Sequence, residues 1–102
     1  MDMNLIMKQA QQFQERLARM QEELAGRQVT STVGGGMVSA TVNGKNELVS
    51  LAIGPEAIDP QDPGMLQDLV VAAVNDAMRQ AKEMAQAEMA KLTGGIKIPG
   101  LF

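Results

Sequence analysis

The chain has 102 residues, a formal net charge of −3 at pH 7 and 45% hydrophobic residues, which predicts a single domain with an ordinary core. It contains no cysteine and no histidine, so disulfides and zinc–thiolate sites are excluded, and we expect no enzyme, no metal site and no cofactor. No apolar stretch approaches the roughly 20 residues that span a bilayer and no signal-peptide pattern is present, so we expect a cytoplasmic protein without membrane contact.

The first expected element is an amphipathic helix over residues 3–25. Its apolar positions are spaced alternately three and four residues apart, which is the heptad pattern of a helix that packs along one side. These positions are Met3, Ile6, Ala10, Phe13, Leu17, Met20 and Leu24. Gly26 follows where a glycine commonly ends a helix. The pattern predicts a rod of roughly 35 Å, and it leaves open whether the rod packs within one chain or against a second copy.

Residues of about 27–54 predict a three-stranded antiparallel sheet, because apolar and polar side chains alternate in three short runs. The runs are 28–33, 37–42 and 47–53. Between the first two, glycines 34–36 predict a wide turn rather than a phosphate-binding loop, since a strand and not a helix follows them. Between the last two, Asn43 and Gly44 predict a two-residue type I′ hairpin turn.

A connecting loop is expected over residues 54–64, which hold three of the four prolines. Asp62 followed by Pro63 has the pattern of an N-cap and a first helical residue. Glu56 and Asp59 lie in the same loop beside prolines. We interpret these carboxylates as capping and solvated groups rather than as metal ligands.

A second helix is expected over residues of about 63–92. Its first half is apolar over a wide arc and should be buried on the sheet, whereas its second half carries only a narrow apolar stripe. The last residues, 93–102, are rich in glycine and predict a flexible tail. The whole chain, residues 1–102, is therefore expected to form one α+β domain of the order α-β-β-β-α.

Both expected helices are longer than strands of about 20 Å. The first helix ends at the sheet and the second begins there, so their free parts project on the same side and can pair antiparallel as a two-helix prong. The expected pairs are Met3 with Met89, Ile6 with Met84, and Ala10 with Ala81. Such a monomer has open sheet edges and too few partners for its apolar stripes, so we expect a two-fold homodimer that carries two prongs.

The order of motifs closely resembles the YbaB/EbfC family of bacterial nucleoid-associated proteins. The matching segments are MKQAQQFQERLARMQEELA, VGGGMVSATVNGKNELVSLAI, MLQDLVVAAVNDAMRQAKE and KLTGGIKIPGLF. The resemblance implies an α-β-β-β-α protein that forms a tweezer-like homodimer with a three-stranded antiparallel sheet and two long helices in each subunit. It also implies binding to double-stranded DNA, a change in DNA conformation, location on the nucleoid and a role in nucleoid organisation and gene regulation.

Basic side chains on the helices and in the tail are the candidate DNA contacts, because cations there can neutralise phosphates. The candidates are Lys8, Arg16, Arg19, Arg79, Lys82, Lys91 and Lys97. No helix-turn-helix or zinc-finger pattern and no interleaved aromatic residues accompany them. We therefore expect weak, salt-sensitive and largely non-specific contacts to phosphates and groove shape.

Three alternatives to DNA contact remain open at this point. Glu15 with Arg19, Arg79 with Glu83, and Glu88 with Lys91 have the spacing of ion pairs on a helix surface, which would occupy these cations without DNA. The prongs, with their methionines, would also suit a protein-interaction adaptor of the replication or recombination machinery. A purely structural oligomer ranks third.

Overall fold

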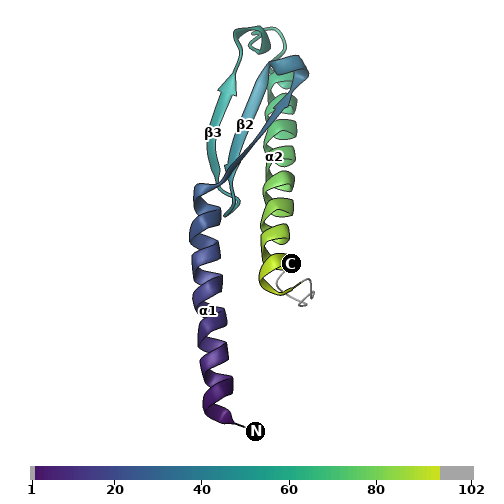
Figure 1. Cartoon of the computed structure of the whole chain (residues 1–102). Helices are drawn as coiled ribbons and strands as arrows, with labels where there is room; N and C mark the ends of the chain where they lie inside the picture. Colours follow the sequence, from purple (N-terminus) through teal and green to yellow (C-terminus); the bar gives the residue numbers. More distant parts are fainter. Residues whose placement is uncertain (1, 95–102) are drawn as a thin grey trace.

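The computed structural model describes residues 2–94 and shows the expected α-β-β-β-α order (Figure 1). The helices and strands are α1 (Met3–Gly26), β1 (Gln28–Val33), β2 (Val38–Asn43), β3 (Leu48–Ile53) and α2 (Pro63–Leu92). Single 3-10 turns lie at Gly34–Gly36 and Pro55–Ala57. Of the expected flexible tail, residues 93–102, only Thr93 and Gly94 are described, and they form a turn after α2; the rest lies outside the described residues.

Carboxylate caps set where both helices begin. The side chain of Asp2 accepts the backbone N–H of Asn4 at 3.0 Å, and that of Asp62 accepts the N–H of Met65 at 3.2 Å. Each bond satisfies one of the donors left free in the first turn of a helix. The expected capping role of Asp62 is therefore confirmed.

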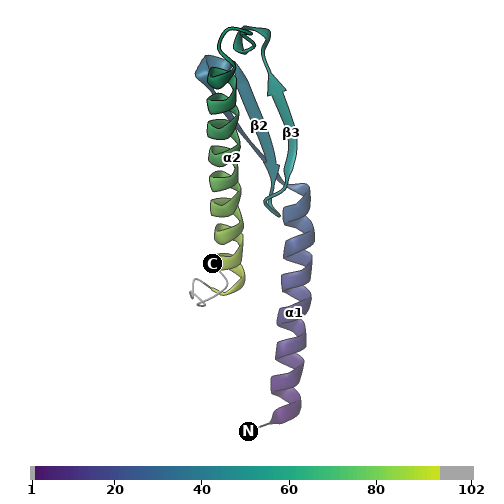
Figure 2. The same ribbon diagram turned by 180° about the vertical axis from the view of Figure 1, so that it is seen from behind.

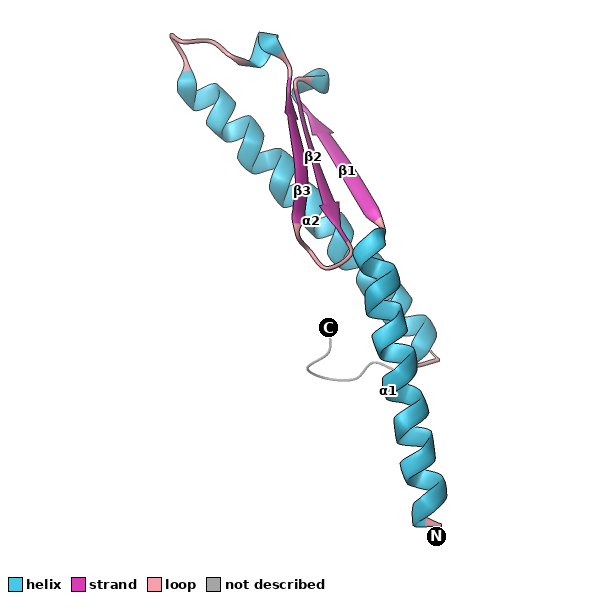
Figure 3. Cartoon of the chain, turned by 90° about the vertical axis from the view of Figure 1, so that its left-hand side faces the viewer, coloured by secondary structure: helices cyan, strands magenta, loops and turns pink. Residues whose placement is uncertain are grey.

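The core lies between the sheet and the first part of α2. The strands are antiparallel in the order β1-β2-β3, and α2 runs across one face of the sheet, as Figure 3 shows from the side. The fully buried residues of this core are Val38, Ala40, Val42, Ala57, Ala73, Ala77 and Ala81. Alanine at every fourth position of α2 puts small side chains on the face that meets β2, so the helix backbone can approach the strand closely. The apolar arc expected for the second helix is the face that packs on the sheet.

β3 forms an uncovered edge of the sheet. Its partners on β2 place Leu51 opposite Ala40 and Ile53 opposite Val38, so these two side chains share the face on which α2 packs. Nevertheless every residue of β3 is exposed, and Leu51 and Ile53 each keep 38% of their surface accessible. The helix covers β1 and β2 and leaves the apolar edge strand bare.

The predicted type I′ turn is wrong. Asn43 ends β2 and Leu48 begins β3, so four residues, Gly44 to Glu47, connect the strands, and the left-handed φ of 65° lies at Asn46 rather than at Gly44. The Asn46 N–H donates to the Asn43 carbonyl (2.9 Å), and the buried Asn43 side chain accepts the N–H groups of Lys45 and Glu47. This is a type I turn followed by a left-handed residue.

Glycine is needed at position 44 because the hairpin backbone approaches the end of α1 closely there. Its N–H donates to the carbonyls of Leu24 (2.9 Å) and Arg27 (3.0 Å). A Cβ on this residue would lie 2.3 Å from the Leu24 carbonyl oxygen. The tip of the β2–β3 hairpin therefore docks on the last turn of α1, a contact between segments twenty residues apart.

The chain is elongated, with extents of 71 × 22 × 16 Å and a radius of gyration of 19.0 Å, against about 13 Å for a compact chain of this length. The two helices project on the same side of the sheet and run antiparallel, as Figures 1 and 2 show from opposite sides. α1 extends well past the end of α2. The prediction of two projecting helices is confirmed in this respect.

The predicted register of the prong is wrong. Met20 and Leu24, in the last turns of α1, pack against Met89, whereas Met3 and Ile6 are exposed. Ala81 belongs to the core on the sheet. The residues of α2 up to Ala81 pack on the sheet. The part of α2 that can pair with α1 is therefore only about 17 Å long, whereas α1 itself is about 36 Å long.

Candidate nucleic-acid interface

Three of the candidate cations gather where the two helices meet. Arg16 and Arg19 from α1 and Lys91 from α2 line one shallow groove of about 350 Å³ together with Glu23 and Glu88. We call this set the basic groove. The spacing of Arg16 and Arg19 places both on one side of α1, and the packing of Met20 on Met89 brings that side to the end of α2.

Glu88 neutralises part of the positive charge at this groove. Its carboxylate accepts from Arg27 at 2.7 Å and from Lys91 at 3.2 Å. The bonds from Arg27 and Lys91 hold the pKa of Glu88 below its usual range. The Glu88–Lys91 pair was expected from its spacing. The Arg27–Glu88 pair was not, because its partners lie 61 residues apart and only the tertiary fold joins them.

Arg79 lies apart from the basic groove and forms ion pairs with two carboxylates. Its guanidinium donates to Asp76 and to Glu83 (2.9 Å), and both carboxylates raise its pKa, Asp76 most. The Asp76 carboxylate also accepts the hydroxyl of the buried Ser31 on β1. Arg79 thus supports a polar link between β1 and α2, and two negative charges surround its positive one.

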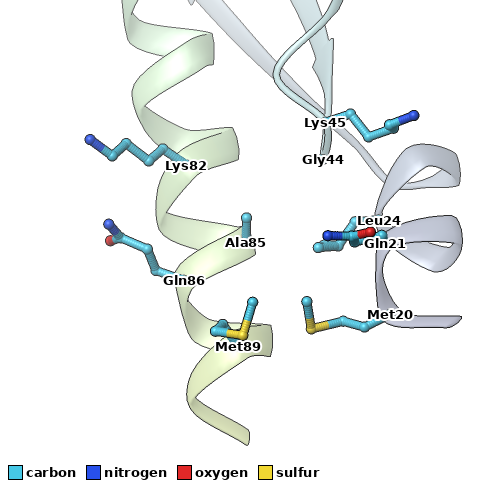
Figure 4. Close-up of a pocket in the computed structure, with 9 residues that line it drawn as sticks. All are labelled: Met20, Gln21, Leu24, Gly44, Lys45, Lys82, Ala85, Gln86 and Met89. Atoms are coloured by element: carbon cyan, nitrogen blue, oxygen red, sulfur yellow. The ribbon is translucent and has the colours of Figure 1, made fainter. Parts of the chain in front are cut away.

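Lys82 lies at a second opening, between α1, the β2–β3 hairpin and α2. This inter-helix cavity has a volume of about 450 Å³ (Figure 4). Its lining residues are Met20, Gln21, Leu24, Gly44, Lys45, Lys82, Ala85, Gln86 and Met89. Lys45 lines it from the hairpin and Lys82 from α2, and Figure 4 shows both side chains extending away from the space between the helices. Lys45 is not among the DNA contacts predicted from the sequence, because no local sequence pattern indicates that Gly44 docks on α1.

The remaining candidates lie further out. Lys8 is exposed in the N-terminal part of α1, and Figure 1 shows the N-terminal part of this helix extending beyond the end of α2. Lys97 lies outside the described residues. Within residues 2–94 the basic side chains that form no ion pair are Lys8, Arg16, Arg19, Lys45 and Lys82. All five are exposed, so all five are open to an anionic partner.

The acidic loop shows no metal-site geometry. Across the described part of the chain, no three carboxylates come together as potential metal ligands. Asp59 accepts the N–H of Gln61 at 2.9 Å, which stabilises the loop before α2. Neither α1 nor α2 is apolar enough over a sufficient length to cross a bilayer.

Comparisons of the sequence and of the structure with known proteins point to one family. Residues 1–96 match the YbaB/EbfC DNA-binding family. A nucleoid-associated protein of Pelotomaculum thermopropionicum is 54% identical over 101 residues, which covers 99% of this chain and 96% of that protein. A nucleoid-associated protein of Desulforamulus reducens is 56% identical with the same coverage. The crystal structure of an uncharacterized Helicobacter pylori protein matches with a TM-score of 0.83 and 26% identity, over 92% of this chain and 99% of that one.

Proposed function

The chain belongs to the YbaB/EbfC DNA-binding family, and from that premise we propose that it binds double-stranded DNA as a homodimer through the cations around its helix junction. The observation that carries the proposal is the basic groove. There Arg16 and Arg19 stand without ion-pair partners among the described residues, next to Lys91 on the other helix. Cations fixed on two rigid helices can contact successive phosphates of one duplex.

The mode of binding follows from the charge balance. The chain carries twelve acidic and nine basic residues, so attraction to DNA comes from a local cluster and not from the net charge. Lys8 adds an exposed cation further along α1, whereas Lys45 and Lys82 line the separate inter-helix cavity. Such contacts read phosphate position and groove shape rather than base sequence, and a two-pronged grip would alter the path of the duplex.

The homodimer is supported by the edge of the sheet. β3 offers unpaired backbone groups on one side, and Leu48, Val49, Leu51 and Ile53 expose between 38% and 48% of their surface. A bare apolar edge strand is a pairing surface that monomeric proteins avoid. Burying β3 against a second copy around a two-fold axis would seal this edge and set two prongs side by side.

A protein-interaction adaptor of the replication or recombination machinery remains the second candidate. It is favoured by the free end of α1, where Met3, Leu5 and Met7 each expose more than half of their surface. DNA does not need so apolar a tip, whereas a protein partner would cover it. Replacing Met3 and Met7 with Gln should leave DNA affinity unchanged if α1 contacts DNA only through its cations.

The experiment that tests the proposal is a titration of fluorescent duplex DNA at salt concentrations between 50 and 200 mM. Phosphate contacts predict that log K falls with log salt with a slope of about −0.9 for each phosphate neutralised. An affinity that does not change with salt, or no binding at low salt, would contradict it. Imaging of the fluorescently tagged protein in a bacterial cell should show it coincident with the nucleoid.

A further inference from the structure

The inter-helix cavity opens beside the last turns of α2, close to where the described residues end. Its floor is apolar, formed by Met20 and Leu24 of α1 and by Ala85 and Met89 of α2 (Figure 4). About 450 Å³ is the size of cavities that bury a small organic ligand. No carboxylate lines it, and its two lysines lie at the rim with side chains that extend away from it (Figure 4). The chemistry of the floor therefore selects an apolar occupant.

We propose that residues 95–102 of the same chain dock in the inter-helix cavity. This segment reads GIKIPGLF and contains four large apolar residues among its eight: Ile96, Ile98, Leu101 and Phe102. In an extended chain alternate side chains point to the same face. Ile96 and Ile98 then enter the cavity together, while Lys97 between them points to solvent and away from the two rim lysines.

α2 ends in a turn that is compatible with a return of the chain along the helix. The Thr93 N–H donates to the Met89 carbonyl at 3.0 Å, and the Gly94 N–H donates to the Lys91 carbonyl at 3.4 Å. Gly94 has a φ of 66°. A left-handed residue after the last turn of a helix allows the chain to turn away from the helix axis.

The length of the segment is sufficient. Eight extended residues span up to about 26 Å. The cavity follows α2 from Met89 back to Lys82, and Lys82 lies about 15 Å from the helix end at Leu92. Tethering keeps the segment at a high effective concentration near the cavity, so modest apolar contacts are enough to hold it there. A second copy has no such advantage.

Cysteine cross-linking tests the docking, since the chain has no native cysteine. The test pair is Ala85→Cys with Ile98→Cys, because Ala85 lines the cavity. The matched control is Ala87→Cys with Ile98→Cys, because Ala87 is the same residue type two positions along α2 and is exposed. Both full-length variants are oxidised mildly and followed by mass spectrometry and non-reducing gels.

Docking predicts an intrachain disulfide that forms at least about ten-fold faster in the test pair than in the control, because the cavity raises the local concentration of one thiol near the other. Equal rates in the two pairs would overturn the proposal. Disulfides between chains in the test pair would overturn it as well, since the occupant would then come from a second copy.

A fluorescence measurement covers the case in which the double cysteine variant does not fold. Phe102→Trp introduces the only tryptophan of the chain. Docking predicts blue-shifted emission and protection from acrylamide, both lost when Ala85→Glu is added and both kept when Ala87→Glu is added. Emission typical of free tryptophan in the single variant would overturn the proposal. Neither measurement involves DNA, so the result stands apart from the proposed DNA binding.

Discussion

The backbone N–H of Gly44 donates to the carbonyl oxygen of Leu24 at 2.9 Å, which joins the tip of the β2–β3 hairpin to the end of α1. This bond fixes the direction in which α1 leaves the sheet. It also carries Lys45 to the rim of the inter-helix cavity, close to the helix junction. The direction of the prong thus depends on a glycine in a strand turn.

Gly44→Ala should therefore destabilise the protein. The added Cβ would lie 2.3 Å from the Leu24 oxygen, so the hairpin must withdraw from α1 at a cost of about 1–3 kcal/mol. Gly26→Ala is the matched control, since nothing lies within 4 Å of its Cβ position, and it should be neutral or slightly stabilising. Urea unfolding followed by circular dichroism measures both. Equal stability of the two variants would show that the hairpin contact does not hold α1.

Glu88→Gln should strengthen DNA binding. The change removes the carboxylate of the basic groove that engages Lys91 and the neighbouring Arg27. Affinity at low salt should rise by roughly two- to five-fold, the effect expected of one exposed charge, and the salt dependence should become steeper. Glu83→Gln removes the same charge beside Arg79, and it should change affinity less. Fluorescence anisotropy with a short duplex compares them. A larger gain from Glu83→Gln would place the DNA elsewhere on α2.

The Asp76 carboxylate should make the protein sensitive to acid. Hydrogen bonds from Ser31, Arg79 and Gln80 lower the pKa of Asp76 from 3.8 to about 2. A carboxyl whose pKa is lowered by folding stabilises the native state above its unfolded pKa. That contribution is lost as the pH falls from about 3.8 towards 2.

Asp76→Asn and Ser31→Ala test this link. The first variant should be less stable than the parent at pH 7, and the difference should shrink between pH 4 and pH 2. The second should raise the pKa of Asp76, since the Ser31 hydroxyl is the largest cause of the lowering. Thermal unfolding over this pH range provides the measurement. A difference between Asp76→Asn and the parent that does not depend on pH would rule out the link.

Leu51→Lys should break the homodimer if β3 is its interface. A lysine there would be buried against the second copy without a partner charge, which is costly. Thr32→Lys, on the exposed side of β1, adds the same charge away from β3 and should leave the dimer intact. Size-exclusion chromatography with light scattering should give twice 10.9 kDa for the parent and the control, and 10.9 kDa for Leu51→Lys. A monomeric parent would refute the dimer itself.

Features encoded by local periodicity could be predicted from the sequence. The heptad spacing located α1 to within one residue, and alternation located the three strands, because each pattern repeats within one element. The carboxylate Asp62 before Pro63 marked the start of α2 for the same reason. These signals require no knowledge of the rest of the chain.

Features that depend on the meeting of distant segments could not be predicted. Gly44 was interpreted through its usual role in tight turns, whereas its function is to let α1 approach. The predicted register of the prong was wrong because no sequence pattern indicates how many residues of α2 pack on the sheet. Arg27 and Lys45 join the candidate site only through the tertiary contacts of Glu88 and Gly44.

The most direct test of the account is DNA affinity measured against salt for the Arg16→Gln/Arg19→Gln variant, with Arg79→Gln as a control of the same charge type. Loss of two phosphate contacts predicts a weaker complex and a salt slope smaller by up to about 2 for each subunit. Arg79→Gln should change the slope little, because two carboxylates already engage that side chain. A double variant that binds with the affinity and slope of the parent would contradict the claim that the basic groove holds DNA.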